Sequence, residues 1–554
     1  MSEPSVTPRP GAGPHSPKSR ARFVYWFVAL TAFLAVCFLH FWRIGAVPRG
    51  FSGDECSRAY NAYCLARTGA DEYGTSWPMF FRGIIDGYYD PLAIYSEVLP
   101  IRVFGLEKWA ARLPSGLYCV LACIAFSILL RHWRFEPMLA VAGGFVLSVI
   151  PWIFALSRSC TYADRIAPLL GMIAGLALTG SALRRRSNWR AVLAGAAWAS
   201  ILYGCQDALP VLTLLAIGCA VVLWRPLVQR WRLIVVMALS ALLVLLPLII
   251  SVVRSSEGLT SRFHQVSITS EATSLRDLIA GVASHYLDYF SPRYLFISGD
   301  QQPRHHTGYG GELYWFLAPL ILAGLYITIR YWRQRASHRI VLVGALVSPV
   351  SGALTVDQMH SPRCVYAVIF WLLLAMFGVQ WLWQRRGPWR KLLLLIACVG
   401  ALEIALYLRD YFGAYQTRDP QALQTELTDA LEYCFAHLGT NQVLYISAST
   451  YTPYGEVVNA KFKPQLYAYI LFFGKIDPLI YQRTGFPTDT VRMYDGHAPR
   501  SGLLLRSNEY YSRRPEGLYA EPDTVPIPPN ARLIKSIPFS GLYSFAEYQI
   551  FAIP

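Results

Sequence analysis

The chain has 554 residues, of which 54% are hydrophobic and only 15% are charged, and its mean hydropathy is +0.34. Soluble chains carry about 25% charged residues, so this composition excludes a disordered chain, a collagen, a coiled coil and a disulfide-stapled secreted module. A protein that crosses a membrane several times remains. The formal net charge of +16 would also suit a nucleic-acid partner, and the positions of the basic residues decide between these explanations.

Eleven apolar runs approach the length of about 20 residues that a membrane-spanning helix needs. In chain order they are Phe23–Trp42, Leu113–Leu130, Pro137–Phe154, Ile166–Leu183, the shorter Ala191–Tyr203, Ala208–Trp224, Leu233–Val253, Leu313–Ile329, Ile340–Val356, Cys364–Trp383 and Leu392–Leu408. The sequence therefore predicts an α-helical polytopic membrane domain at 23–408 with about 11 transmembrane helices. It follows a Pro/Ser/Gly-rich basic tail at 1–22, which we expect to be disordered and cytoplasmic.

The connection after every second run is short and rich in arginine. These connections contain Arg131 and Arg134, Arg184–Arg186 and Arg190, Arg225, Arg230 and Arg232, Arg330–Arg339, and Arg385–Lys391. Short basic loops mark the cytoplasmic side, so the N-terminus is predicted to be cytoplasmic. Much of the net charge is then a topology signal, and the sequence predicts no nucleic-acid partner.

The segment after Arg409 has a different composition, with Asp, Pro, Tyr and Arg throughout. Gln421–His437 has the spacing of an amphipathic helix, and Gln442–Ser447, Gly502–Arg506 and Phe545–Ile553 resemble strands. We predict an α/β domain at 409–554. An odd number of crossings would place it on the extracytoplasmic side.

Two outer loops, 43–112 and 254–312, are longer and more polar than a simple connection requires, which is typical of loops that carry function. The first contains two adjacent carboxylates, Asp54 and Glu55, close after the first apolar run. An Asp at the bilayer centre costs about 2.5–3.5 kcal/mol, so the pair must lie in an aqueous pocket or at the interface. The alternative, which spacing alone favours, is a solvated loop or a helix N-terminus capped by Asp54.

Other outer segments offer arginine and histidine side chains. A guanidinium group binds phosphate oxygens through two parallel donors, although arginines at helix ends also serve as interfacial anchors. His305 and His306 could be metal ligands, but neighbouring histidines on a loop more often are not, and we assign no metal ligand. The candidate substrate-binding residues are Arg58, Tyr89, Asp90, Arg158, Arg293, Arg304, His305 and Arg363.

The order of these pieces resembles the GT-C glycosyltransferases, of the protein O-mannosyltransferase and aminoarabinose-transferase type. The segments that carry the resemblance are Gly53-Asp54-Glu55, Thr68-Gly69, Asp90-Pro91-Leu92, Phe104-Gly105, Arg112-Leu113-Pro114-Ser115, Arg158 with Asp164, Ser291–Phe296 with Gly299-Asp300, and His360–Arg363. The resemblance covers about residues 23–410. It implies transfer of a sugar from a polyprenyl-phosphate carrier to a glycan, lipid or protein acceptor on the outer face, usually with inversion. A bacterial inner (plasma) membrane fits that carrier.

The resemblance also implies roles for three acidic residues. Asp54 matches the catalytic acidic position of these enzymes, Glu55 stands beside it, and Asp164 matches a second outer acidic position. Aminoarabinose transferases carry a Lys-Pro-Pro-Leu before the second helix, whereas this chain has Tyr89-Asp90-Pro91-Leu92. The cation at the lipid phosphate must therefore come from elsewhere, and neither aminoarabinose nor lipid A is implied.

The chemistry needs a base for the incoming group and positive charge at the departing phosphate. A carboxylate that accepts the proton as the new bond forms contributes about 10²–10⁴-fold, and fixed cations contribute the electrostatic part. We expect Asp54 to be the base, Glu55 to orient the base or the acceptor, and Arg158, Arg293, Arg304 and Arg363 to supply the phosphate contacts. We assign no cofactor, and a divalent metal at the phosphate is the alternative to arginine.

Two functions from other classes compete with this hypothesis. A transporter or flippase should carry ionisable residues near mid-bilayer and broken helices in corresponding halves, whereas Glu403 is the main acidic exception and lies toward a helix end. A non-catalytic accessory subunit of a cell-envelope glycan assembly system should tolerate loss of Asp54 and Asp164 and depend on the domain after Arg409.

Overall fold

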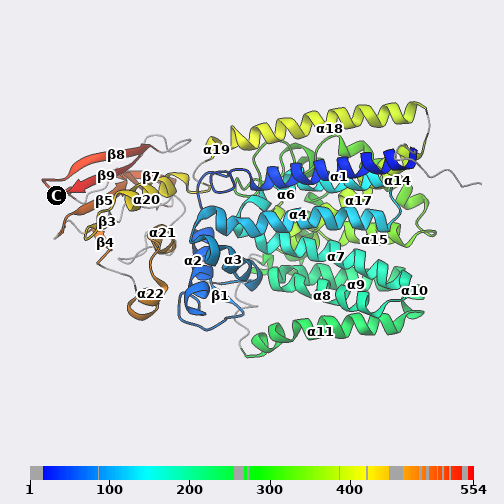
Figure 1. The fold of residues 1–554 in the computed structure, drawn as a ribbon, viewed down its shortest axis with the longest axis horizontal. Coiled ribbons are helices and arrows are strands. Elements are labelled where there is room, and N and C mark those ends of the chain that lie inside the picture. Colours follow the sequence, from blue (N-terminus) through cyan, green and yellow to red (C-terminus); the bar gives the residue numbers. More distant parts are fainter. Residues whose placement is uncertain are drawn as a thin grey trace, which may run out of the picture.

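The computed structural model describes residues 17–84, 87–254, 267–270, 274–385, 387–419, 422–447, 466–485, 489–494, 498, 500–507, 509–514, 517–522, 526–538 and 547–554. The described part is elongated, with a bundle of helices at one end and a mixed β-sheet at the other (Figure 1). Helices α2 and α3 lie between the two. Most of the predicted tail at 1–22 falls outside the described residues.

The helices of the bundle follow the eleven predicted apolar runs. They are α1 (Pro17–Phe41), α4 (Lys108–His132), α5 (Pro137–Val149), α6 (Pro151–Phe154), α7 (Ala163–Arg185), α8 (Asn188–Gly204), α9 (Leu209–Val222), α10 (Trp224–Val228), α11 (Trp231–Arg254), α14 (Leu317–Arg330), α15 (Ala336–Val347), α16 (Val350–Ala353), α17 (Ala367–Gln384) and α18 (Pro388–Phe412). Within the described ranges, seven helical spans are long and apolar enough to cross a membrane. The chain is therefore an integral membrane protein.

The expected number of about eleven crossings is not confirmed by helix length. The pair Pro137–Val149 and Pro151–Arg158 would be an eighth span, bent by 59° where Pro151 lacks the N–H that would continue the helix. Helices α8, α9 and α14 follow predicted runs but contain 17, 14 and 14 residues. Since a straight crossing needs about 20 residues, their spanning remains a prediction.

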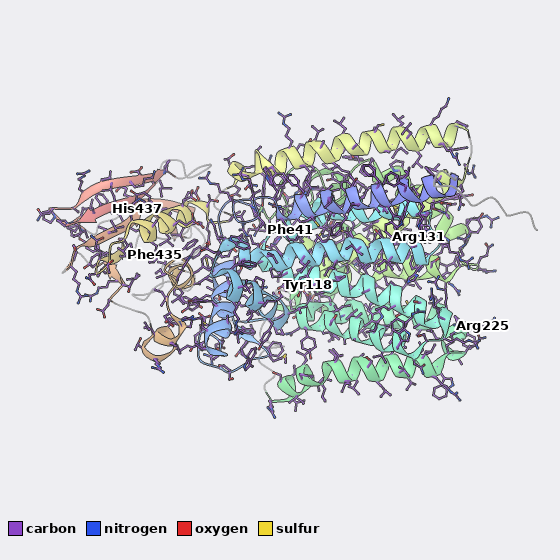
Figure 2. All side chains as sticks on the ribbon, in the orientation of Figure 1. Phe41, Tyr118, Arg131, Arg225, Phe435 and His437 are labelled. Carbon is purple, nitrogen blue, oxygen red and sulfur yellow. The ribbon has the colours of Figure 1, made fainter. Side chains whose placement is uncertain are left out.

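The basic connections lie at the end of the bundle that faces away from the sheet. Arg131 and Arg225 mark that end, whereas Phe435 and His437 mark the sheet domain at the other (Figure 2). The polar connecting segments gather at the sheet end of the bundle (Figure 1). Their elements are α2 (Gly53–Thr68), β1 (Phe81–Arg82), β2 (Tyr88–Tyr89), α3 (Pro91–Phe104), η1 (Leu156–Arg158), η2 (Cys160–Tyr162), η3 (Gln206–Ala208), η4 (Ile268–Ser270), α13 (Leu275–Asp288), η5 (Arg293–Ile297) and η6 (Ser361–Cys364).

The C-terminal part contains a five-stranded sheet of order β4-β3-β5-β9-β8. Strands β4, β3 and β5 are parallel, and β9 pairs antiparallel with β5 and β8. The predicted amphipathic helix corresponds to α20, and the three predicted strands correspond to β3, β5 and β9. The elements are α19 (Tyr415–Arg418), α20 (Thr425–His437), β3 (Val443–Ser447), α21 (Leu466–Phe473), α22 (Pro478–Thr484), β4 (Val491–Tyr494), β5 (Gly502–Ser507), the hairpin β6 (Glu509–Arg514) and β7 (Gly517–Pro522), β8 (Arg532–Pro538) and β9 (Glu547–Ile553).

The sheet domain shares a hydrophobic core with the first connecting segment. Phe51 and Tyr60 pack in one cluster with Leu431 of α20 and Phe472 of α21, and the rings of Phe51 and Phe472 are stacked 4.6 Å apart. Burying such side chains stabilises by about 1.5–3 kcal/mol each. The predicted boundary at 409 therefore separates two stretches of sequence whose side chains form one core.

Candidate active site

Helix α2 begins at a capping box. The Ser52 Oγ accepts from the backbone N–H of Glu55 (3.3 Å), and the Ser52 N–H donates to the Glu55 carboxylate (3.2 Å). This reciprocal pair satisfies two of the unpaired donors at a helix start. The cap is therefore Ser52, and Asp54 lies in the first turn with its carboxylate left available for other contacts.

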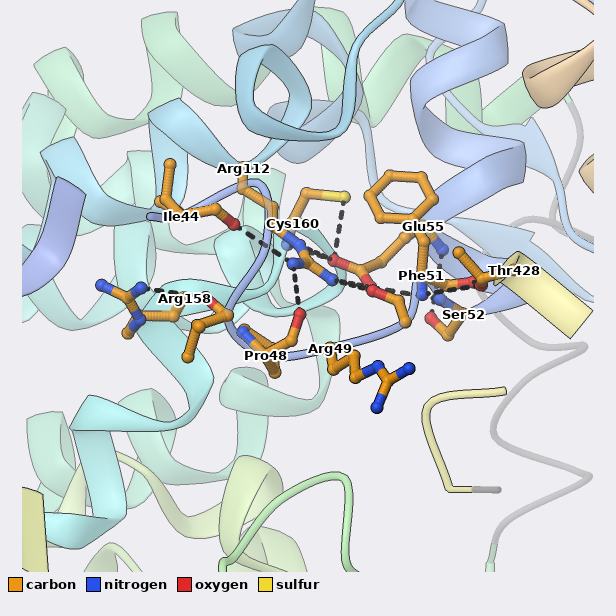
Figure 3. Close-up of polar contacts among 12 residues, drawn as sticks. Ile44, Pro48, Arg49, Phe51, Ser52, Glu55, Arg112, Arg158, Cys160 and Thr428 are labelled. Carbon is orange, nitrogen blue, oxygen red and sulfur yellow. Dashed lines mark hydrogen bonds and ion pairs between the residues drawn. The ribbon is translucent and has the colours of Figure 1, made fainter. Parts of the chain in front are cut away.

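Glu55 is enclosed by the protein. The Arg112 guanidinium donates to both of its carboxylate oxygens at 2.9 Å, and the backbone N–H of Cys160 donates at 3.1 Å (Figure 3). Neither side chain of the ion pair is exposed. Burial alone would raise the pKa of Glu55, but the charge and hydrogen bonds of Arg112 hold that pKa below its ordinary value. Glu55 stays ionised, and its oxygens face Arg112 rather than a substrate.

Two buried arginines hold the segment 42–50 that leads from α1 to α2. Arg112 also donates to the carbonyls of Pro48 (2.9 Å) and Gly50 (2.8 Å). Arg158 donates to the carbonyls of Trp42 (2.8 Å) and Val47 (2.9 Å) and to that of Leu39. The Arg158 side chain is fully buried. Arg158 was predicted to bind phosphate, but these guanidinium N–H groups donate to backbone carbonyls instead.

The sheet domain holds the same segment from its other side. Arg49 forms an ion pair with Asp429 at 2.8 Å, and the N–H of Phe51 donates to Thr428 Oγ1 at 3.1 Å (Figure 3). Gly50 has φ +86, and a Cβ there would lie 2.5 Å from the Leu423 carbonyl. A residue with a side chain would therefore force this segment away from Leu423, which directly precedes the start of α20.

Asp54 stands at the open side of this framework. The Tyr89 hydroxyl donates to Asp54 Oδ1 at 2.9 Å, and Arg304 Nη1 lies 3.6 Å from Oδ2. The side chains of Asp54 and Arg304 are 36% and 35% exposed. Burial and the nearby Asp54 charge raise the pKa of Tyr89 well above its ordinary value. The hydroxyl therefore keeps its proton and orients the carboxylate.

A row of alternating charges continues inward from Tyr89. The Arg58 guanidinium lies over the Tyr89 ring, 4.6 Å from its centroid, and donates to Asp164 Oδ2 at 3.0 Å. Arg165 then lies 3.6 Å from Asp164 Oδ1 and 2.5 Å from Asp207 Oδ1. Burial opposes the Arg58 charge, but Asp164 and then Tyr89 and Asp54 raise its pKa above the ordinary value. Arg58 Nε and Nη1 are buried and have no hydrogen-bond partner among the residues that the structure describes.

Two further acidic residues near this row are buried. Asp90 accepts from Gln206 Nε2 at 2.7 Å, and burial, with Asp164 as the next cause, raises its pKa to about 7. Glu97, on α3, is fully buried, and neither of its carboxylate oxygens has a hydrogen-bond partner within the described ranges. Burial raises the pKa of Glu97 well above its ordinary value, so this side chain is held neutral.

The connection between α11 and α14 contributes a second polar group. His305 Nδ1 is 2.8 Å from Asp300 Oδ2, which also accepts from the N–H of Ser361 at 2.7 Å. Glu312 accepts from the N–H of Asp300 at 2.9 Å and from the Ser361 hydroxyl. Burial, followed by the Asp300 charge, raises the pKa of Glu312 to about 8. These bonds connect the segment 300–312 to η6.

The structure brings five of the predicted site residues into one cluster. They are Asp54, Arg58, Tyr89, Asp164 and Arg304. Asp90 contacts η3, His305 belongs to the second polar group, and Glu55 and Arg158 lie in the supporting framework. Arg363 pairs with Asp357 at 2.7 Å, and Arg293 is an exposed residue of η5 whose side chain forms no ion pair with the described residues.

Sequence reasoning did not assign roles to Arg112, Arg165 or Asp207. Arg112 was visible only as part of the Arg-Leu-Pro-Ser segment, and its pairing with Glu55 depends on a contact across 57 residues. The Ser52-x-x-Glu55 pattern was the available signal, because it identifies the start of α2 and gives Glu55 a structural role.

A groove of about 860 Å³ lies between the bundle and the sheet domain, away from Asp54. Its lining includes Phe41, Trp109, Phe435 and Phe473, and Figure 2 shows Phe41 and Phe435 on the two sides. The ion pairs Lys108–Glu432 (2.6 Å) and Lys475–Glu107 (2.5 Å) cross it. None of the predicted site residues lines this groove.

No protein-family model and no curated protein matches the chain, but solved structures do. The oligosaccharyltransferase of Archaeoglobus fulgidus, tethered with an acceptor peptide containing the NVT sequon, is 11% identical, with a TM-score of 0.52 over 92% of this chain and 75% of that one. Its apo form is 12% identical, with a TM-score of 0.50 over 92% and 76%. ArnT from Cupriavidus metallidurans, bound to undecaprenyl phosphate, is 16% identical, with a TM-score of 0.48 over 92% and 99%. The oligosaccharyltransferase matches show that the chain has the fold of that enzyme.

Proposed function

We propose that this protein is a membrane glycosyltransferase that transfers a sugar from a polyprenyl-phosphate-linked donor to an acceptor on the extracytoplasmic face, with inversion. One observation carries the proposal. Within a GT-C fold, a partly exposed carboxylate, Asp54, is oriented by the Tyr89 hydroxyl and flanked by the Arg304 guanidinium. The bound undecaprenyl phosphate of ArnT and the dolichol phosphate of the archaeal enzyme are consistent with such a donor.

The proposed step breaks the bond between the anomeric carbon and the phosphate oxygen. The acceptor hydroxyl or amine forms the new bond to that carbon, its proton passes to Asp54, and the polyprenyl phosphate leaves with the electron pair. A carboxylate in this role contributes about 10²–10⁴-fold. The carboxylate makes this contribution only if its position is fixed, and the hydrogen bond from Tyr89 fixes the position of Asp54.

Positive charge for the leaving phosphate comes from arginine in this proposal. Arg304 is half-buried beside Asp54, and Arg58 has two buried nitrogen atoms with no hydrogen-bond partner in the described part of the chain. Guanidinium groups that are already desolvated stabilise developing charge strongly because they need no reorganisation. Asp164 orients Arg58, so we propose that it acts as a positioning residue, together with Glu55 and Arg158.

The two ends of the bundle support a proposal for the orientation of the protein in the membrane. The basic connections lie at the end opposite the sheet domain (Figure 2), and short basic loops stay in the cytoplasm. We therefore propose that Asp54 and the sheet domain face the extracytoplasmic side of a bacterial inner membrane. A carrier lipid held in the bilayer could then present its phosphate at the level of α2.

The experiment supplies purified full-length protein in liposomes with a panel of polyprenyl-phosphate sugars and measures release of free polyprenyl phosphate. We expect one donor to be consumed, and Asp54→Asn to lower that turnover at least 100-fold. The matched control is Asp489→Asn, because that carboxylate is 81% exposed in the sheet domain. Transfer by Asp54→Asn at the control rate would reject the proposed base, and transport of an unmodified lipid across the bilayer would favour a flippase instead.

A further inference from the structure

The groove between the bundle and the sheet domain lies at the level where two membrane-capable spans end. Phe41 is the last residue of the span Arg22–Phe41, and Trp109 lies in the first turn of the span Lys108–His132. The first span has 20 residues, and a helix of that length extends about 30 Å, which matches the thickness of the hydrocarbon core. The groove therefore opens where the headgroups of membrane lipids lie.

Exposed aromatic side chains surround the mouth of the groove. Trp42 lies between the lining residues Phe41 and Arg43. The ring of Trp109 packs against that of Phe104, the last residue of α3, with 4.8 Å between centroids. Trp42, Phe104 and Trp109 are all exposed. Tryptophan side chains concentrate at membrane–water interfaces, where their rings contact lipid and their N–H groups contact water, so these rings also place the groove among lipid headgroups.

The two walls of the groove are apolar. Phe41 and Trp109 belong to the bundle, whereas Phe435 and Phe473 belong to the sheet domain (Figure 2). The groove measures about 860 Å³, and pockets for small ligands measure about 300–1,000 Å³. This volume accommodates a lipid headgroup with the first part of its acyl chains. Because acyl chains leave one apolar environment for another, the headgroup decides which lipid binds.

One cation in the groove is not neutralised by a described carboxylate. Lys108 pairs with Glu432 at 2.6 Å, and Lys475 pairs with Glu107 at 2.5 Å. Arg43 lines the groove, is exposed, and forms no ion pair with the residues that the structure describes. The lining therefore combines three cations with two carboxylates. A guanidinium group binds phosphate oxygens through two parallel donors, so the excess positive charge suits a lipid phosphate.

We propose that this groove binds one anionic phospholipid from the leaflet on the side of the sheet domain. The lipid phosphate binds at Arg43, and the acyl chains follow the exposed apolar side chains Leu34 and Phe38 of α1 into the bilayer. The lipid joins the ends of α1 and α4 to α20 and α21, and it holds the sheet domain at the membrane surface. None of the candidate active-site residues lines the groove, so the proposal does not depend on sugar transfer.

The direct test adds phosphatidylglycerol to delipidated full-length protein in detergent and measures bound lipid by native mass spectrometry. We expect one phosphatidylglycerol to bind tightly, and phosphatidylcholine, whose headgroup has no net charge, to bind about tenfold more weakly. Arg43→Gln should also weaken phosphatidylglycerol binding about tenfold, because it removes a charged donor. The matched control is Arg67→Gln, since Arg67 is exposed on α2 and does not line the groove. It should bind as the wild type does.

A second pair of variants fills the groove without changing its charge. Ala436 is exposed on α20 and lines the groove, whereas the next residue, His437, is exposed and does not. Ala436→Trp should therefore abolish tight binding of phosphatidylglycerol, and His437→Trp should retain it. Equal affinity for phosphatidylglycerol in the wild type and in folded Arg43→Gln and Ala436→Trp variants would overturn the proposal, as would phosphatidylcholine binding as tight as that of phosphatidylglycerol.

A measurement on the wild type keeps the proposal testable if these variants do not fold. Phosphatidylglycerol with a photoreactive headgroup, in vesicles of phosphatidylglycerol and phosphatidylcholine, should crosslink to Arg43–Ala46 or to Phe472–Lys475. Crosslinks confined to the membrane-facing surfaces of α11 and α18 would overturn the proposal. Displacement of the lipid by inorganic phosphate would indicate a site for a free anion, and tighter binding of polyprenyl phosphate would assign the groove to the carrier lipid. Either result would also overturn the proposal.

Discussion

The two halves of the candidate site leave different buried atoms without a hydrogen-bond partner among the described residues. In the α2 half, formed by Asp54, Arg58 and Asp164, these atoms include two guanidinium nitrogens of Arg58 and the Oδ1 atom of Asp164. In the histidine half, formed by Asp300, His305 and His360, they include the Nδ1 atom of His360. Guanidinium donors without acceptors suit an anion such as phosphate, whereas an imidazole nitrogen donates or accepts according to its tautomer. The comparison therefore favours the α2 half as the place for the phosphate contact of the proposed function.

The framework beneath the α2 half should show the largest effect on stability. Glu55→Gln leaves the Arg112 guanidinium buried without its counter-charge, and breaking a buried pair in this way costs about 3–5 kcal/mol. We expect a marked fall in the thermal unfolding midpoint in detergent. Glu432→Gln is the control, because its ion pair with Lys108 is partly exposed. Equal midpoints for the two variants would contradict the structural role assigned to Glu55.

Loss of the contact between the Tyr89 hydroxyl and Asp54 should have the second-largest effect. Tyr89→Phe removes a hydrogen bond to a charged group, worth about 1.5–3 kcal/mol, so turnover should fall about 10–100-fold. Tyr95→Phe removes a comparable hydroxyl that donates to the Pro78 carbonyl at 2.8 Å, and it should keep most of its activity. If both variants retained the same activity, Tyr89 would not orient the base.

Glu72, a buried residue that contacts Asn61 of α2, should make the stability of the folded protein depend on pH. It accepts from Asn61 Nδ2 at 3.0 Å, and burial raises its pKa to about 8. A carboxyl whose pKa is raised by folding contributes stability at low pH, and that contribution is lost as the pH rises through about 8. The unfolding midpoint of Glu72→Gln should therefore fall less between about pH 6 and about pH 9 than that of the wild type. Identical pH profiles would show that Glu72 is ionised in the folded protein.

The smallest effect is expected where the sheet domain meets the bundle across the groove. Lys475→Met removes an exposed ion pair with Glu107, and such pairs contribute about 1 kcal/mol or less. The unfolding midpoint should change slightly, and the difference should vanish in high salt. A large loss of stability would mean that this ion pair, rather than the shared apolar core, holds the sheet domain in place.

Several parts of this fold could be predicted from sequence, because apolar length and local periodicity are local properties. The eleven apolar runs became helices, and Gly502–Arg506 became the buried strand β5. The lengths of α9 and α14 were not predictable, since helix ends depend on tertiary packing. The candidate site likewise contains some features that the sequence predicts and others that depend on tertiary contacts. Asp54, Arg58 and Asp164 come together as a set, but the enclosure of Arg158 by the carbonyls of Trp42 and Val47 depends on contacts across more than 100 residues.

The most direct test of the account is a single-turnover measurement with Asp54→Asn, in which donor binding and sugar transfer are followed separately. If Asp54 is the base, the variant should bind the lipid-linked sugar within about threefold of the wild type, and its transfer rate should fall at least 100-fold. The smaller loss of activity expected for Tyr89→Phe should also appear in the transfer rate. Wild-type transfer by Asp54→Asn, with donor binding intact, would contradict the central claim.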